Sequence, residues 1–233
     1  MAAVITEKRC NSYSYVRCRP RRCHEKFGDS ATYEVRLRRA TIAHFNESND
    51  VPRNDPLPRA ALRVTLRRLG SDDLAAFQAY RHEPVVSQYQ SWSATSDEAA
   101  RTFLSDMRAV SMFVPGEWFQ IGIADITTDE LIGDIGICVA SDQTQAEIGF
   151  TLRRSLHGRG LAHEAVREAI ALIFEVTSSL RVVAITDARN IAAQHMLTAL
   201  GMTYIAAYNA EFHGETYVEH TFHLDRHIGL VDH

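Results

Sequence analysis

"SLHGRGLAHEAV", residues 155–166, is the stretch of the chain that decides its fold. Two glycines, Gly158 and Gly160, stand where an apolar stripe of helical spacing begins. Glycine costs a helix about 1 kcal/mol relative to alanine, so two glycines at a helix start need a separate reason. The stripe that follows consists of Leu161, Ala165, Val166, Ala169, Ile170, Ile173 and Phe174. The pattern predicts a strand-to-helix turn whose backbone is approached closely by another molecule.

The corner around these glycines has the features of an anion site. A helix N-terminus presents unpaired N–H groups and about half a positive charge. Arg153, Arg154, His157 and Arg159 add positive charge around it. A phosphate-bearing ligand is one interpretation, and a helix entry with solvated arginines is the other. A P-loop is excluded because no Gly-Lys-Ser/Thr follows, and the three-glycine spacing of a dinucleotide-binding fingerprint is absent.

Outward from this turn, strand and helix patterns alternate in a definite order. Strands are predicted at residues 62–69, 118–125, 130–139, 146–152, 181–186, 203–209 and 215–224. Helices are predicted after Ser71, after a capping box formed by Thr95 and Glu98, and over residues 161–174 and 190–200. The predicted class is therefore α/β (α+β), with the order β-α-α-β-β-β-α-β-α-β-β.

Several motifs within this order are shared with one known family. The loop stands as Ser155-Leu-His-Gly158-Arg-Gly160, followed by Ala162-His-Glu164-Ala165, and Asn190 precedes "LTALGM". Together with the strands "ELIGDIGI" and "AEIGFTL", the chain from about residue 62 to 226 resembles the GNAT family of acetyl-CoA-dependent N-acetyltransferases. It is most similar to the branch that contains the ribosomal-protein N-terminal (alanine) acetyltransferases. The resemblance implies a mixed, mostly antiparallel seven-stranded sheet with helices on both faces.

The resemblance also implies where acetyl-CoA binds. The pyrophosphate would lie on the N–H groups of residues 158–162, and the strand before the loop would splay from its parallel neighbour "RVVAIT" and leave main-chain groups open to pantetheine. Asn190 would lie near the pantetheine arm, although its other role is simply to cap the next helix. The residues implied to bind acetyl-CoA are Phe150, Leu152, His157, Gly158, Arg159, Gly160, Leu161, Ala162 and Asn190.

Catalysis in this family requires an amine that is neutral when it attacks the thioester. An α-amino group near pKa 7.8 costs only about 1 kcal/mol to deprotonate at pH 7, against about 4 to 5 kcal/mol for a lysine, so one modest base or an ordered water is sufficient. Glu147 matches the family's strand position closest to the thioester, and a structural acid on a half-exposed strand is the alternative. Glu147 and Asn190 are the predicted catalytic residues. Trp92 and Trp118 either line the acceptor site or belong to the core.

Two positions depart from the family pattern. Ser155 stands where the family has Gln or Arg, and Ala193 stands where the branch often has a serine that serves the departing thiolate. We predict an enzyme that transfers acetyl from acetyl-CoA to a protein α-amino group or a small-molecule amine. The alternative is a catalytically weak acyl-CoA-binding module that acts as a sensor or partner. A homodimer is left open.

The first quarter of the chain differs in charge from the remainder. Residues 1–59 carry 12 basic and 7 acidic residues, against 13 and 22 in the rest. We expect residues 1–59 to be a disordered extension with a proline-rich linker, residues 60–228 to form the acetyltransferase domain and residues 229–233 to be a tail. A nucleic-acid-binding arm is the less favoured interpretation of the extension.

The cysteines and the hydropathy pattern argue against a metal site, a membrane span and a secretion signal. Cys10, Cys18, Cys23 and His24 have no common zinc-site spacing, so we predict no metal. No run of eighteen apolar residues appears, so no membrane span is expected. The N-terminus lacks the layout of a secretion signal, which favours a cytoplasmic location.

Overall fold

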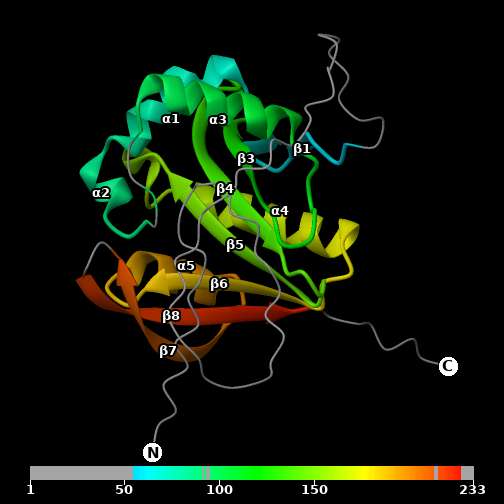
Figure 1. Cartoon of the computed structure of the whole chain (residues 1–233), viewed down its shortest axis with the longest axis vertical. Helices are drawn as coiled ribbons and strands as arrows, with labels where there is room; N and C mark the ends of the chain where they lie inside the picture. Colours follow the sequence, from blue (N-terminus) through cyan, green and yellow to red (C-terminus); the bar gives the residue numbers. More distant parts are fainter. Residues whose placement is uncertain (1–54, 91, 93–94, 213–214, 227–233) are drawn as a thin grey trace, which may run out of the picture.

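The computed structural model describes residues 55–90, 92, 95–212 and 215–226, and Figure 1 shows how their helices and strands are arranged. The strands of this part are β1 (Arg59–Ala60), β2 (Val64–Arg68), β3 (Trp118–Asp125), β4 (Leu131–Val139), β5 (Gln145–Leu152), β6 (Arg181–Asp187), β7 (Thr203–Phe212) and β8 (Glu215–Asp225). The helices are α1 (Leu74–Arg81), α2 (Pro84–Ser87), α3 (Asp97–Ala109), α4 (Leu161–Val176) and α5 (Ile191–Ala199). None of these helices is long and apolar enough to cross a membrane.

The described strands form a single mixed sheet in the order β1-β2-β3-β4-β5-β6-β8-β7. Only β5 and β6 are parallel neighbours, and the other pairs are antiparallel. The predicted mostly antiparallel sheet is confirmed, but it has eight strands rather than seven. The additional strand is β1, whose two residues Arg59 and Ala60 pair with Leu66 and Thr65. A two-residue strand has no periodicity by which its sequence could be recognised.

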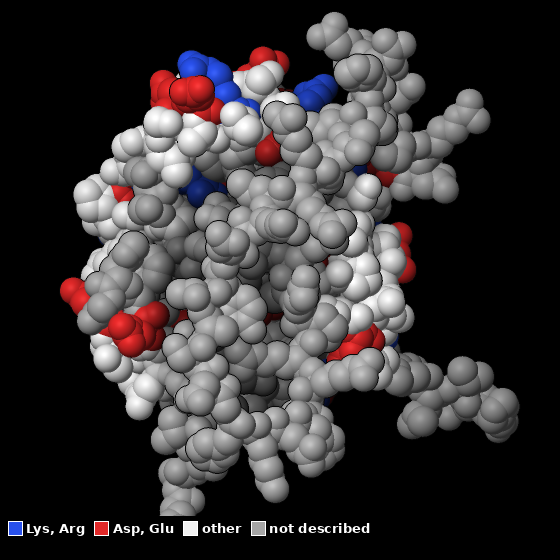
Figure 2. Space-filling model, in the orientation of Figure 1, with Lys and Arg blue, Asp and Glu red and all other residues white. Residues whose placement is uncertain are grey.

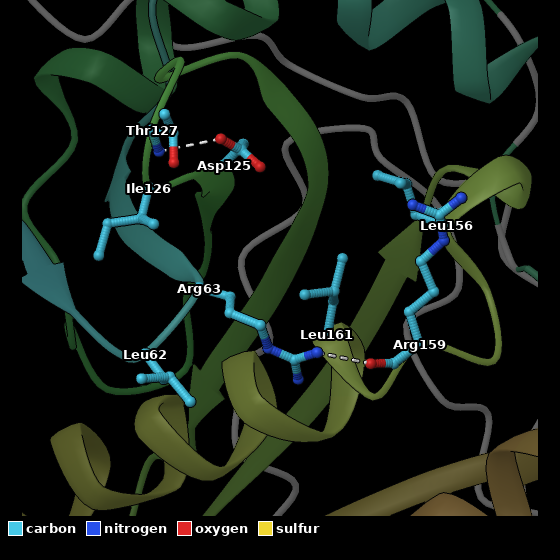
Figure 3. Close-up of a pocket in the computed structure, with 8 residues that line it drawn as sticks. All are labelled: Leu62, Arg63, Asp125, Ile126, Thr127, Leu156, Arg159 and Leu161. Carbon is cyan, nitrogen blue, oxygen red and sulfur yellow. Dashed lines mark hydrogen bonds between the residues drawn. The ribbon is translucent and has the colours of Figure 1, made fainter.

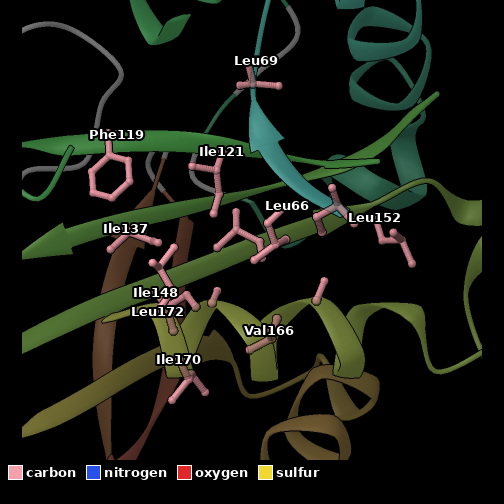
Figure 4. Packing of buried hydrophobic residues seen from close by; sticks show 14 of the residues in the cluster. Leu66, Leu69, Phe119, Ile121, Ile137, Ile148, Leu152, Val166, Ile170 and Leu172 are labelled. Atoms are coloured by element: carbon pink, nitrogen blue, oxygen red, sulfur yellow. The ribbon is translucent and has the colours of Figure 1, made fainter. Parts of the chain in front are cut away.

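One face of the sheet, which we call the apolar face, carries a continuous aliphatic layer of the core. Strand residues point alternately to the two faces, and register places aliphatic side chains side by side across four strands, namely Leu66, Ile123, Ile121, Ile135, Ile137 and Ile148. Helix α4 packs against this face with the stripe that contains Val166 and Leu172 (Figure 4). The predicted stripe of α4 is therefore its core-facing side.

The opposite face, which we call the polar face, carries Gln120, Asp134, Gly136, Glu147 and Gly149. Helices α1 and α3 lie over the part formed by β3 and β4, so helices cover both faces as predicted (Figure 1). The surface over α1 and α3 carries both acidic and basic side chains, as the upper edge of Figure 2 shows.

A buried polar network joins α1 to the polar face. The Tyr80 hydroxyl donates to Asp134, and the Arg81 guanidinium lies 3.3 Å from both Asp134 Oδ2 and Gln120 Oε1. Burial, and then the Asp134 charge, raises the pKa of Tyr80 well above its usual value, so the phenol remains a donor. The guanidinium also stacks on the Trp92 ring at 4.3 Å. Trp92 is only 7% exposed, so it belongs to the core rather than to an open binding surface.

Two predicted boundaries are shifted. The side chain that caps α3 is Ser96, whose Oγ accepts from the Ala99 N–H at 3.3 Å, so the predicted cap at Thr95 is wrong by one residue.

Packing also begins before residue 60, because Leu57 is 7% exposed and Arg59 pairs with Glu168 of α4 at 2.6 Å. Residues 1–54, which include Cys10, Cys18, Cys23 and His24, and residues 227–233 lie outside the described chain. Their predicted nature stays a prediction.

The close contact of β4 with β5 allows a test of the register. A Cβ at Gly133 would lie 2.2 Å from the Thr151 carbonyl oxygen and 3.0 Å from Leu152 Cα, whereas a Cβ at Gly149 would meet no atom within 4 Å. We expect Gly133→Ala to lower the free energy of unfolding by about 2 to 3 kcal/mol because the two strands must move apart. Gly149→Ala should change it by less than about 0.5 kcal/mol. Urea unfolding measures both, and equal losses would contradict the register.

Candidate active site

The two parallel strands β5 and β6 separate from each other along their length. Their paired residues run only from Gln145 with Arg181 to Ile148 with Ala184. Beyond that point β5 continues against β4 alone, through Gly149–Leu152, and β6 continues against β8 alone. A gap bordered by main-chain groups therefore opens between the carboxyl ends of the two strands. The splay that the resemblance implied is present.

The main-chain groups of Phe150 and Leu152 face this gap. The Arg153 N–H donates to the Ile132 carbonyl at 2.8 Å, and hydrogen-bonded pairs alternate along an antiparallel ladder. Residues 147, 149, 151 and 153 therefore bond to β4, and Phe150 and Leu152 point the other way. Both of their carbonyls accept from side chains, the first from Gln90 Nε2 at 3.3 Å and the second from the His157 ring at 2.7 Å.

The His157 ring has a defined tautomer in this arrangement. A carbonyl only accepts hydrogen bonds, so Nε2 must carry the proton that is donated to Leu152. The Arg154 guanidinium lies 3.2 Å from Nδ1, which is then the acceptor. His157 thus links the end of β5 to the loop that follows it. This contact is not recognisable in the sequence, because it depends on how the loop folds back onto the end of β5.

The loop after β5 adopts the backbone that the glycines were expected to allow. Gly158 and Gly160 have φ of +74° and +77°, a region that L-residues with side chains seldom enter. Gly160 is the N-cap of α4 and supplies no capping side chain, and the space beside Gly158 is empty to 4 Å. The first N–H groups of α4, from Leu161 and Ala162, have no intrahelical partner. The loop and helix start therefore expose a set of main-chain donors.

A cavity of about 400 Å³ lies on the side of this loop that faces β2 (Figure 3). Its lining combines aliphatic, acidic and basic side chains, namely Leu62, Arg63, Asp125, Ile126, Thr127, Leu156, Arg159 and Leu161. Of the basic residues predicted around the corner, Arg159 lines this cavity, whereas Arg153 pairs with Glu130 at 2.7 Å and binds the Leu131 carbonyl. Arg153 therefore supports the β3–β4 turn.

Asn190 lies on the other side of the gap, where β6 leads into α5. Its Oδ1 accepts from the Ala193 N–H at 3.1 Å, so the predicted helix cap is confirmed. Ala193 is buried in the first turn of α5, and its methyl group offers no proton. The cap fixes the direction in which α5 leaves the end of β6.

Glu147 lies on the polar face of β5, two residues before the strands separate. It stands between Cys138 of β4 and Val183 of β6 and is half-buried. Gly149 and Gly136 flank it on the same face, and a Cβ at Gly136 would be 3.4 Å from the Trp118 ring. Trp118 is 44% exposed. The polar face beside the gap thus brings together Glu147, the glycine pair Gly136 and Gly149, and the exposed ring of Trp118.

Comparison with known proteins agrees with this geometry. A family model for the acetyltransferase (GNAT) domain matches residues 63–203, and the chain belongs to this family. The protein is accordingly an acetyltransferase. Within the described residues, no three His, Cys, Asp or Glu side chains are grouped as a metal ion would require.

Individual relatives support the same class. An uncharacterized N-acetyltransferase of Bacillus licheniformis, p20, is 29% identical over 140 residues, which are 59% of this chain and 78% of p20. A GNAT-family acetyltransferase of Bacillus anthracis has a similar structure, with a TM-score of 0.65 and 18% identity over 72% of this chain and 98% of that one. The ribosomal L7/L12 alpha-N-protein acetyltransferase RimL, solved with coenzyme A, has a TM-score of 0.59 and 17% identity over 70% and 94% of the two chains. These structures show the shared fold.

Proposed function

We propose that the chain transfers the acetyl group of acetyl-CoA to an amine by direct attack of the amine on the thioester. The pyrophosphate lies on the N–H groups of residues 158–162, and pantetheine lies in the gap between β5 and β6. The observation that carries the proposal is the loss of β5–β6 pairing after Ile148, on the strand whose following loop carries Gly158 and Gly160 and opens α4. An extended ligand would lie along the unpaired edge of β5 and over this loop.

The polar groups of this surface fit acetyl-CoA chemically. Phe150 and Leu152 each present a carbonyl that accepts from a side-chain N–H, and the amides of pantetheine offer donors of the same kind. The helix start offers N–H groups and the positive end of its dipole to the phosphates. His157 and Arg159 flank that end. A carbonyl oxygen has two lone pairs, so each of these carbonyls can accept an amide N–H of pantetheine in addition to its side-chain donor.

Glu147 is proposed as the general base. It takes a proton from the attacking amine, directly or through one water, as the C–N bond forms and the C–S bond breaks. The departing thiolate takes its proton from water, because Ala193 has no hydroxyl and a thiol pKa near 8.5 leaves the protonated form in excess at pH 7. Asn190 holds the start of α5 beside the pantetheine. The acceptor is a protein α-amino group or a small-molecule amine.

A second function is favoured by one observation, the methyl group of Ala193 in place of a proton donor. The chain would then bind acyl-CoA as a weakly catalytic sensor or partner module. Release of free CoA thiol with a panel of peptide N-termini, polyamines, aminoglycosides and amino acids distinguishes the two. Turnover with any of these supports the enzyme, and tight acetyl-CoA binding without turnover supports the module.

The glycine loop allows a test of where the phosphates of acetyl-CoA bind. Gly158→Ala should weaken acetyl-CoA binding by about 10-fold or more, because the methyl group enters the space assigned to phosphate. Gly201→Ala is the matched control, since Gly201 has φ of +82° and lies after α5. Both variants carry about 1 to 2 kcal/mol of backbone strain, so they should lose similar stability. Calorimetry measures the affinities, and an unchanged dissociation constant for Gly158→Ala would show that the phosphates lie elsewhere.

Glu147 allows a test of the general base. Glu147→Gln should lower kcat by about 100-fold and remove the rise of rate below neutral pH, because the amide cannot accept a proton. Its affinity for acetyl-CoA should stay within about twofold, since the carboxylate faces the acceptor side. Glu117→Gln, at an exposed carboxylate before β3, is the control. If Glu147→Gln turns over at the parent rate from pH 6 to 9, another group is the base.

A further inference from the structure

An arginine that lies 101 positions before Glu164 in the sequence contacts the start of α4. Arg63, the residue before β2, donates its backbone N–H to Glu164 Oε1 and its Nε to Glu164 Oε2 at 2.9 Å. Its Nη1 also donates to the Arg159 carbonyl at 2.8 Å (Figure 3). One side chain thus holds the loop before α4 and the first turn of α4 at the same time.

The bond to Arg159 determines where the next N–H group points. In a trans peptide the C=O and N–H groups lie in one plane and point in nearly opposite directions. The Arg159 carbonyl points at Arg63, which lies beside β2. The Gly160 N–H therefore points away from Arg63 and away from β2. Gly160 also leaves room for this contact, since a Cβ there would stand 3.4 Å from Arg63 Nη2.

The bond to Glu164 removes an electrostatic conflict. Glu164 is 5% exposed and lies in the first turn of α4, where a carboxylate would repel a phosphate bound at the same helix end. Burial opposes its ionisation, but the backbone N–H and guanidinium of Arg63 offset this, so the pKa of the Glu164 carboxyl lies below its ordinary value. The carboxylate is therefore charged and paired, and Arg63 neutralises it beside the loop.

We propose that Arg63 is a positioning residue for the phosphate end of acetyl-CoA. It holds the Gly160 peptide with its N–H toward the ligand, and it neutralises Glu164. Arg63 acts through these two contacts and takes no part in the reaction at the thioester. The inference rests on the proposed function and deepens it: it assigns part of the acetyl-CoA affinity to a residue outside the loop motif. The guanidinium reaches Glu164 through Nε and the Arg159 carbonyl through Nη1, and the single nitrogen of a lysine does not reproduce this spread of donors.

The test compares acetyl-CoA with acetyl-pantetheine, a thioester that has no pyrophosphate. Arg63→Gln should raise the KM and the dissociation constant for acetyl-CoA by about 10-fold, with kcat at saturation and the KM of the acceptor within about twofold. Its kcat/KM with acetyl-pantetheine should equal that of the parent. Arg63→Lys should recover less than half of the lost acetyl-CoA affinity on a logarithmic scale.

Arg67→Gln is the control for a merely structural effect. Arg67 lies within β2, four residues after Arg63, and binds Asp73 at 2.8 Å rather than the loop before α4, so its loss should lower the melting temperature without changing acetyl-CoA affinity. An equal loss of kcat/KM with both thioesters in Arg63→Gln, or full recovery in Arg63→Lys, would overturn the positioning role. Unchanged acetyl-CoA affinity in Arg63→Gln would overturn this inference alone. A parent protein that does not bind acetyl-CoA would overturn the proposed function and the inference with it.

Discussion

The separation of β5 from β6 after four paired residues is the constraint on which the rest of the site depends. Main-chain N–H and C=O groups inside a protein need partners, and a parallel strand that loses its neighbour leaves a row of them. Gln90 and His157 supply donors to two of these carbonyls. The same separation directs β5 into the glycine loop on one side of the gap and β6 into the Asn190 cap on the other.

Local spacing made much of this predictable. Gly158 and Gly160 were recognisable because two glycines before an apolar helical stripe need a separate reason, and close approach of another molecule was the predicted one. Their positive φ angles are a second reason, which the structure adds. Asn190 was recognisable as a cap by residue type and position, and Glu147 was assigned to the face of Gly149 by simple alternation. The order of strands and helices followed from the hydrophobic periodicities, whereas the GNAT family was recognised by the resemblance of its motifs, which the family model over residues 63–203 confirms.

What escaped prediction depends on contacts between distant parts of the chain. Arg63 has the ordinary place of a polar residue in a strand, and nothing in its neighbourhood indicates a partner 101 positions away. Arg153 was assigned to the anion corner with its neighbours, but Glu130 of the preceding hairpin binds it. The cap at Ser96 differs from the predicted Thr95 by one residue, because adjacent hydroxyls are equivalent in sequence and only the backbone turn selects between them.

The central claim is that acetyl-CoA lies along the gap and over the loop, and residue-resolved amide hydrogen exchange by NMR, with and without coenzyme A, tests it most directly. The account predicts slower exchange at the amides of Phe150, Leu152, Gly160, Leu161 and Ala162 when coenzyme A is added. The amide of Thr151, which already bonds to β4, should not change. Protection that is absent from these residues, or that is confined to the cavity lined by Leu62 and Ile126, would contradict the account.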